Sequence, residues 1–276
     1  MNESIFKPGA TAVITGAAMG IGLAAATRCA EAGMNVCLAD VDGAELDAVQ
    51  DRVARAAQAA GGEVMSTVTD VGDGAAMDAL REMVERRLGP VGFLMNNAVT
   101  RVGGGVWGDP DDWRRAMDVN FWGVVNGVRS FVPAMIEGGT AGAVVNVGSK
   151  QGITNPPGNT VYNVTKAAVK HYTEALAHEL RNTENCRVTA HLLVPGWTTT
   201  GKKEHKPGAW LPEQVVERMI DALGRGDFYI VCPDGEVSEE MDRQRIRWAA
   251  GDITENRPAL SRWHPDFKEA FETDAG

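Results

Sequence analysis

Short runs rich in β-branched and apolar residues alternate with longer helical patterns from residue 10 to about residue 232. Strands that alternate with helices of this length are typical of βαβ units, whose strands run parallel in one sheet. The alternation therefore predicts an α/β fold, a doubly wound seven-stranded parallel sheet with helices on both faces. The expected strands are Ala10–Thr15, Met34–Asp40, Glu63–Thr69, Val91–Asn96, Ala143–Val147, Arg187–Val194 and Phe228–Cys232.

The helical patterns fill the gaps between these runs, and Asp109-Pro110 supplies an N-cap and a first-turn proline for a short extra helix. From Asp234 the chain changes character, with a charged helix near Glu236–Ala250 and then a tail that contains tryptophan and proline. We expect the tail, with Trp248, Trp263, His264 and Pro265, to cover either its own active site or that of a neighbouring subunit. We expect one domain over residues 1–276, with a flap at about 197–211 and a C-terminal extension at about 234–276. The other expected helices are Gly20–Ala32, Ala44–Ala60, Gly74–Leu88, Val119–Met135, Thr160–Asn182 and Pro212–Leu223.

Charge and cysteine usage exclude several classes of partner. The chain has 37 acidic and 27 basic residues, a net charge of −10 that repels nucleic acid and anionic lipid. The uncharged stretch Pro8–Thr27 contains four glycines and a proline, so we interpret it as a strand that leads into a helix rather than a membrane span. The four cysteines are far apart in apolar surroundings, which favours free thiols. We expect a cytoplasmic protein that binds neither nucleic acid nor membrane.

The segment Thr15–Gly22 follows the first strand and opens the first helix with the spacing G-x-x-x-G-x-G. Glycines at such a turn let the backbone approach a pyrophosphate, and the helix N-terminus offers unpaired N–H groups. The spacing differs from the G-x-G-x-x-G of the general dinucleotide fingerprint, but the strand–turn–helix context is the same. The segment therefore predicts a dinucleotide-binding loop.

Asp40 ends the second strand, 18 residues after Gly22. A carboxylate here can accept hydrogen bonds from both adenosine ribose hydroxyls of NAD and would repel the 2′-phosphate of NADP. No basic residue occupies Ala17, Ala18 or Val41, from which a cation would neutralise that phosphate. The sequence therefore favours NAD over NADP, and it places Asp70 and Val71, after the third strand, within reach of the adenine.

Tyr162 and Lys166 begin a long helix and are one turn apart, so their phenol and ammonium groups project side by side. A nearby cation favours tyrosinate, which makes the phenol a usable base. Ser149 ends the fifth strand thirteen residues earlier, where its hydroxyl can hydrogen-bond a carbonyl or alkoxide oxygen. Three further features occur along the chain: Asn96-Asn97-Ala98 at the end of the fourth strand, Asn120, and Pro195–Thr200 after the sixth strand.

Taken together, these motifs resemble the short-chain dehydrogenase/reductase family, in the single-domain branch with a TGxxxGxG loop and a YxxxK pair. The resemblance runs from Ala10 to about Cys232 and implies a Rossmann-like fold. It also implies a catalytic tetrad of Asn120, Ser149, Tyr162 and Lys166. Tyr162 would be the general acid/base and Ser149 would polarise the substrate oxygen. Lys166 would lower the tyrosine pKa and hold the nicotinamide ribose, while Asn120 would keep a water that links Lys166 to solvent.

The family pattern further implies a set of residues around the dinucleotide. They surround its pyrophosphate, its two riboses, its adenine and its carboxamide. In chain order they are Gly16, Gly20, Ile21, Gly22, Asp40, Val41, Asp70, Val71, Asn97, Ala98, Tyr162, Lys166, Pro195, Gly196, Thr198 and Thr200. No metal is expected, because His171 and His178 are seven residues apart on one helix, too far to bind one ion together.

The expected reaction is reversible hydride transfer between NAD and a secondary alcohol or ketone. Two alternatives remain open: an epimerase or dehydratase that retains its NAD, and a non-catalytic NAD-binding module that senses redox state. The epimerase pattern usually carries G-x-x-G-x-x-G and a larger substrate lobe, which this sequence lacks.

Substrate recognition is expected from the segments after strands four, five and six. Tryptophans there either wall an aromatic or apolar pocket or pack within the flap itself. The basic flap Gly201–Gly208 is expected to be a solvated lid, with attraction of an anionic substrate as the alternative. The candidate substrate residues are Arg101, Lys150, Trp197 and Trp210.

The helix Phe121–Val132 is apolar over much of its circumference. Together with the family resemblance, it suggests a homotetramer or homodimer formed through this helix and the Tyr162 helix.

Overall fold

All seven expected strands are present in one parallel sheet. The computed structural model describes residues 5–201 and 204–273. Its sheet has the strand order β3-β2-β1-β4-β5-β6-β7, and every neighbouring pair is parallel. The fold class predicted from the sequence is confirmed. The strands are β1 (Thr11–Thr15), β2 (Asn35–Asp40), β3 (Val64–Val68), β4 (Val91–Asn96), β5 (Gly142–Val147), β6 (Val188–Val194) and β7 (Tyr229–Val231).

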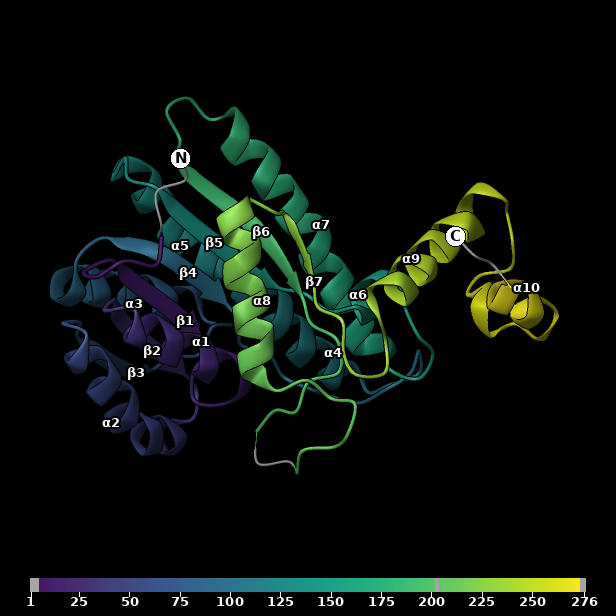
Figure 1. Ribbon diagram of the computed structural model, residues 1–276, viewed down its shortest axis with the longest axis horizontal. Helices are drawn as coiled ribbons and strands as arrows, with labels where there is room; N and C mark the ends of the chain where they lie inside the picture. Colours follow the sequence, from purple (N-terminus) through teal and green to yellow (C-terminus); the bar gives the residue numbers. More distant parts are fainter. Residues whose placement is uncertain (1–4, 202–203, 274–276) are drawn as a thin grey trace.

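Helices cover both faces of this sheet (Figure 1). On one face α1 (Gly20–Glu31) packs between α2 (Gly43–Ala59) and α8 (Pro212–Arg225). On the other face α3 (Gly74–Leu88) packs against α5 (Gly123–Glu137), and α7 (Thr160–Asn182) covers β6. The remaining helical segments are α4 (Pro110–Met117), the π-turn η1 (Asp118–Trp122), α6 (Gln151–Thr154), α9 (Glu239–Thr254), the 3₁₀ turns η2 (Ser261–Trp263) and η3 (Pro265–Phe267), and α10 (Lys268–Thr273).

Two hydrophobic cores lie on the two faces of the sheet. One joins the apolar sides of α1, α2 and α8 to strand residues such as Ile14 and Leu38, and the other joins α3, α5 and α7 to strand residues such as Val13 and Leu94. Alternate residues of β1 thus enter opposite cores, and β1 and β5 are buried along their whole length. Continuous burial of this kind is what a parallel sheet covered on both faces requires.

The strand order reverses between β1 and β4. After β1 the chain adds β2 and β3 on one side, and then crosses back to place β4 on the other side of β1. The loops that leave β1 and β4 therefore run in opposite directions and open a crevice at the carboxyl edge of the sheet, where ligands bind in open α/β sheets.

A chain of buried amides braces the sheet below this edge. Asn96 at the end of β4 donates to Asn146 of β5 (2.8 Å), and Asn146 donates to Thr173 of α7 (3.0 Å). Gly127 of α5 lies so close that a Cβ there would come within 2.1 Å of the Asn96 amide oxygen. Because buried amides are costly to leave unpaired, these bonds favour one relative placement of β4, β5 and α7.

The helix expected over Val119–Met135 is built differently from the prediction. Helical backbone already begins at Pro110, capped by Asp109, and continues through the π-turn η1 into α5. The extra residue of a π-turn is a local irregularity that often marks a functional site, and Asn120 lies within it. In the C-terminal extension, Ser238 caps α9, so this helix runs from Glu239 to Thr254 rather than from Glu236 to Ala250.

The C-terminal extension packs at one end of the sheet. Helix α9 contacts α6, and α10 folds back beside η2 and η3 at the yellow end of the chain (Figure 1). No helix in residues 5–201 or 204–273 is both long enough and apolar enough to span a bilayer.

Candidate active site

A cleft of about 1090 Å³ opens at the carboxyl edge of the sheet. Its walls come from the segments that follow β1 to β6, which is where the sequence placed its candidate residues. Of the expected catalytic and cofactor-binding residues, two, Gly22 and Asn120, do not line the cleft and lie behind its wall. The expected residues that do line it are Gly16, Gly20, Ile21, Asp40, Val41, Asp70, Val71, Asn97, Ala98, Ser149, Tyr162, Lys166, Pro195, Gly196, Thr198 and Thr200.

The glycine loop after β1 needs its glycines for two different reasons. Gly16 and Gly20 have φ angles of +63° and +58°, which side chains other than glycine rarely adopt. Gly22 has no room for a side chain, because a Cβ would come within 2.1 Å of the Gly16 carbonyl oxygen. Gly22 thus lets α1 pack under the loop, whereas Gly16 and Gly20 shape the surface that faces the cleft.

The N-terminus of α1 fits a pyrophosphate. Its N-cap residue, Met19, gives no side-chain hydrogen bond, and the first turn has no acidic residue. Helices α2, α3 and α4, by contrast, begin with an aspartate that accepts a backbone N–H. The free N–H groups of α1 and its positive dipole end therefore face the cleft without a partner from the protein's own side chains.

Hydrogen bonds between neighbouring strands hold the loop in shape. The Thr15 hydroxyl accepts from the backbone N–H groups of Asn97 (3.0 Å) and Ala98 (3.1 Å). The Asn97 side chain donates in return to the carbonyls of Thr15 and Gly16, both at 3.0 Å. The loops after β1 and β4 therefore form one braced unit across the point where the strand order reverses.

Asp40 is held at the end of β2. One carboxylate oxygen accepts from the N–H of Ala18 in the glycine loop (3.0 Å), and the other accepts from the N–H of Asp42 (3.1 Å). The negative charge is thus held beside the glycine loop, next to the exposed Val41. Further along the cleft, Asp70 accepts from the N–H of Gly72 (2.9 Å) and shapes the turn after β3.

Ser149, Tyr162 and Lys166 meet at the other end of the cleft. Burial raises the pKa of the Tyr162 phenol, while a hydrogen bond with Ser149 and the positive charge of Arg101 oppose that rise. Lys166 is only 2% exposed, and its Nζ lies 5.8 Å from the centre of the Tyr162 ring. Nζ donates to the carbonyl of Val147 at the end of β5 (2.7 Å). Burial, together with the charge of Arg101, lowers the pKa of the Lys166 ammonium to about 7.

Asn120 lies behind these groups and joins the loop after β4 to α7. Its amide oxygen accepts from the N–H of Thr100 (2.8 Å), and its nitrogen donates to the Thr100 carbonyl and to the Thr165 hydroxyl, both at 3.1 Å. The side chain is fully buried, and both of its N–H groups are used within the protein. The side chain therefore joins these two segments, and of its polar groups only the amide oxygen keeps a lone pair for the water expected beside Lys166.

A second cavity of about 870 Å³ adjoins the first and shares Ser149 and Tyr162 with it. Of the expected substrate residues, Arg101, Lys150 and Trp197 line it. Trp210 does not: its side chain packs against the core formed with α1 and α8, and its backbone N–H donates to the Trp197 carbonyl (2.8 Å). Trp210 thus positions the flap and does not wall the pocket. Two lysines of the expected basic flap, Lys202 and Lys203, lie outside the described residues.

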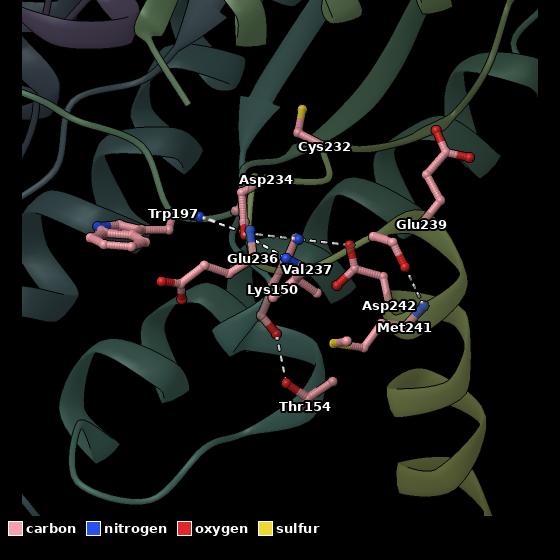
Figure 2. A network of polar contacts seen from close by, with 12 residues as sticks. Lys150, Thr154, Trp197, Cys232, Asp234, Glu236, Val237, Glu239, Met241 and Asp242 are labelled. Carbon is pink, nitrogen blue, oxygen red and sulfur yellow. Dashed lines mark hydrogen bonds and ion pairs between the residues drawn. The ribbon is translucent and has the colours of Figure 1, made fainter. Parts of the chain in front are cut away.

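Lys150 lines the second cavity, but its charge is paired. The ammonium lies 2.6 Å from the Asp242 carboxylate of α9 and 3.3 Å from that of Asp234 (Figure 2). The same Asp234 oxygen accepts from the N–H of Trp197 (3.0 Å). Gly196 leaves room for this cluster, since a Cβ there would come within 2.8 Å of the ammonium. Lys150 thus joins the extension to the loops around Ser149 and Trp197, and its contact with a substrate stays a prediction.

The extension adds five residues to this cavity: Asp234, Val237, Arg245, Arg262 and Trp263. Sequence reasoning named Trp263, in a tail expected to cover this active site or a neighbour's, and missed the other four. The only sequence signal was the presence of arginines and tryptophans in a tail attached to an acidic chain. Their position depends on how α9 docks, which no local motif encodes.

Comparisons with known proteins agree with this geometry. The family model for short chain dehydrogenase matches residues 10–208, and the chain belongs to that family. The SadH protein of Mycobacterium tuberculosis is 40% identical over 175 residues, which cover 62% of this chain and 61% of SadH. The match to SadH thus spans about three fifths of that protein. The 1-deoxy-11-beta-hydroxypentalenate dehydrogenase of Streptomyces avermitilis is 35% identical over 80% of this chain and 83% of its own length.

Solved structures of the same family superpose over most of the chain. A short-chain dehydrogenase/reductase from Burkholderia phymatum in complex with NAD has a TM-score of 0.80 and 32% identity, covering 92% of this chain and 96% of that one. A metagenomic short-chain oxidoreductase in complex with NADP has a TM-score of 0.69 and 27% identity, covering 82% of this chain and 98% of that one. The chain thus belongs to a family of which one of these solved members was crystallised with NAD and the other with NADP.

The buried Lys166 makes the stability of the protein depend on pH. Its pKa is about 7 in the folded protein and about 10.4 in an unfolded chain. Between these values the unfolded chain binds one more proton than the folded one. The free energy of unfolding therefore rises with pH in this window, by up to about 1.4 kcal/mol per pH unit. We predict that Lys166→Met loses this part of the slope, measured by urea unfolding without cofactor at a series of pH values.

The matched control is Lys170→Met, one turn further along α7, where the ammonium pairs with Glu174 at 2.8 Å and is partly exposed. The buried thiols, whose raised pKa values also make stability vary with pH, are common to all variants and cancel in the difference. Parallel curves for the wild type and Lys166→Met between pH 7 and 10 would contradict the assigned burial.

Proposed function

We propose that the protein is an NAD-dependent dehydrogenase/reductase that interconverts a secondary alcohol and a ketone. The observation that carries the proposal is the meeting of Ser149, Tyr162 and Lys166 where the dinucleotide-sized cleft joins the second cavity. The first cavity would hold the dinucleotide, and the second would hold a small-molecule substrate. The alcohol carbon would then lie beside the phenol of Tyr162.

Tyr162 is the proposed general acid/base. NAD, when bound, supplies the hydride acceptor and a positive charge. In the oxidative direction the Tyr162 oxygen takes the proton of the substrate hydroxyl, while the Ser149 hydroxyl hydrogen-bonds the same substrate oxygen. The Lys166 ammonium opposes the cost of burying the tyrosinate, because opposite charges interact strongly in a low-dielectric site. In the reductive direction the phenol returns the proton to the developing alkoxide.

NAD is the proposed cofactor in preference to NADP. Family members are solved with either dinucleotide, so the choice rests on this chain's own Asp40. The carboxylate is held beside the glycine loop by Ala18 and Asp42, with lone pairs left to accept from ribose hydroxyls. A 2′-phosphate would meet a like charge there, which costs several kcal/mol.

The flap at about 197–211 and the extension at about 234–276 are proposed to complete a single catalytic domain.

A homotetramer or homodimer through α5 and α7 is also proposed, but fewer residues support it than the sequence suggested. Apolar residues of α5, such as Val124, Val128 and Phe131, suggested more apolar surface than the sheet alone would cover. These residues are buried within the single chain. The support that remains is the exposure of Trp122 and Val164.

We place the protein in the cytoplasm, which suits its four free cysteines, all within the described residues.

Tyr162→Phe removes only the phenolic oxygen. We predict that kcat for alcohol oxidation falls about a hundredfold to ten-thousandfold, the usual contribution of a positioned acid or base. NADH binding, followed by its fluorescence, is retained because the rest of the cleft is unchanged.

The matched control is Tyr172→Phe on the same helix, where the ring packs against Phe121 outside both cavities and turnover stays at the wild-type level. Wild-type turnover in Tyr162→Phe would refute the proposed acid/base. Product formed by the wild type without net reduction of added NAD would instead favour the epimerase or dehydratase alternative.

Asp40→Asn removes the charge while it keeps an oxygen acceptor. We predict that the ratio of kcat/KM for NADP to kcat/KM for NAD rises about tenfold to a hundredfold, because the repulsion of the 2′-phosphate is lost. Steady-state kinetics with both dinucleotides measure it. Asp47→Asn, an exposed carboxylate on α2, removes the same charge and should leave the ratio unchanged. An unchanged ratio in Asp40→Asn would show that NAD preference has another origin.

A further inference from the structure

The wall of the second cavity includes residues of the C-terminal extension. Arg245 of α9, Arg262 of η2 and Trp263 line it, together with Ser149, Tyr162 and Arg101. Residues that the family model does not match therefore help to form the proposed substrate pocket.

Arg245 and Arg262 bring two positive charges close together. Burial and the nearby charge of Arg245 lower the pKa of the Arg262 guanidinium to about 10. Among residues 5–201 and 204–273, neither arginine has an ion-pair partner. Asp242 acts on Arg245 electrostatically, but its carboxylate is paired with Lys150 at 2.6 Å. Two like charges at one wall of the cavity are thus unpaired within the described residues, and the acidic residues that also line it, Asp234 and Glu204, form no ion pair with either arginine.

The Nε of Arg245 is buried and has no hydrogen-bond partner. A buried guanidinium donor without an acceptor carries a desolvation penalty, so the paired carboxylates nearby do not satisfy Arg245 fully. Arg262 is held over two aromatic rings, at 4.7 Å from the centre of Trp263 and 5.1 Å from that of Phe271. Stacking supports the planar guanidinium and leaves its N–H edge available for hydrogen bonds.

The turn before Arg262 is built to hold it. Leu260 adopts a φ angle of +58°, an uncommon conformation for a bulky residue. Ser261 is fully buried, accepts from the indole N–H of Trp248 (2.8 Å) and donates its backbone N–H to Asp252 (3.1 Å). Arg257 pairs with the same Asp252 at 3.1 Å and stacks on Trp248. Strained backbone held by this many polar bonds is typical of a functional position.

The other end of the extension is anchored to the active site. The Lys150–Asp242 ion pair ties the start of α9 to the residue next to Ser149 (Figure 2). Both ends of the segment that carries Arg245 and Arg262 are therefore positioned. Lys150, next to Ser149, holds one end, and the turn around Ser261 holds the other. In a chain with a net charge of −10, this gives a positively charged pocket wall on an acidic protein.

We propose that Arg245 and Arg262 form an anion subsite that binds a carboxylate of the substrate. The substrate is then a hydroxy acid in one direction and a keto acid in the other, with its oxidisable carbon at Ser149 and Tyr162. Guanidinium groups match a carboxylate with two parallel hydrogen bonds, and an acid gains them whereas its ester does not. This inference rests on the proposed function and adds the substrate class to it.

The test compares keto acids with their methyl esters as ligands of the NADH-loaded protein. Acetoacetate, levulinate and para-acetylbenzoate span short to long separations between carbonyl and carboxylate. Isothermal titration should give at least one acid that binds about tenfold to a hundredfold more tightly than its ester, the usual worth of charge-assisted hydrogen bonds. Arg245→Leu and Arg262→Leu should each remove most of that preference, and Arg262→Lys should retain part of it.

Arg247→Leu is the matched control, because Arg247 is an exposed arginine on the same helix and lines neither cavity. It should keep the full preference for the acid. NADH affinity and thermal unfolding of each arginine variant verify that it is folded. Equal binding of every acid and its ester, binding of neither, or a preference that survives in both leucine variants would overturn the subsite. Because binding is measured, these results are separate from hydride transfer, whose absence with every alcohol would refute the proposed function instead.

Discussion

All seven strands run parallel, so the carboxyl ends of β1, β2, β4, β5 and β6 meet at one edge of the sheet, and this constraint positions every other part of the site. The reversal of strand order between β1 and β4 opens the crevice at that edge. The glycine loop with its uncapped helix, the carboxylate of Asp40 and the hydroxyl of Ser149 come from three different βα units. They share one cleft because the sheet aligns the ends of their strands.

Within that cleft, Lys166 and Tyr162 lie side by side, with the buried ammonium 5.8 Å from the centre of the phenol ring. Burial alone favours the neutral form of both groups, since it lowers the pKa of Lys166 and raises that of Tyr162. A buried ammonium and a buried phenolate that are close together each reduce the penalty of the other. In the proposed mechanism, the charge state of one group would therefore affect the proton affinity of the other. The carbonyl of Val147 accepts a hydrogen bond from the ammonium and fixes its position.

Local patterns predicted the sheet, the glycine loop and the bounds of α3 and α7, because periodicity and turn chemistry act over a few residues. The π-turn around Asn120 was not predicted, since its extra residue is stabilised by contacts with Thr100 and Thr165 on other segments. The prediction of the substrate residues was the least accurate. Lys150 is paired with acids more than eighty residues later in the chain. Arg245 and Arg262 reach the pocket through the docking of α9, to which these ion pairs and the Arg218–Glu239 ion pair contribute.

Transfer of deuterium from the substrate to the dinucleotide tests the central claim most directly. Isopropanol and the hydroxy acids related to the three keto acids, each deuterated at the carbinol carbon, would be incubated with the protein and NAD. Mass spectrometry of the reduced dinucleotide should show the label for at least one alcohol and no label with Tyr162→Phe. Reduced dinucleotide that carries no deuterium, or no reduction with any alcohol, would contradict hydride transfer at this site.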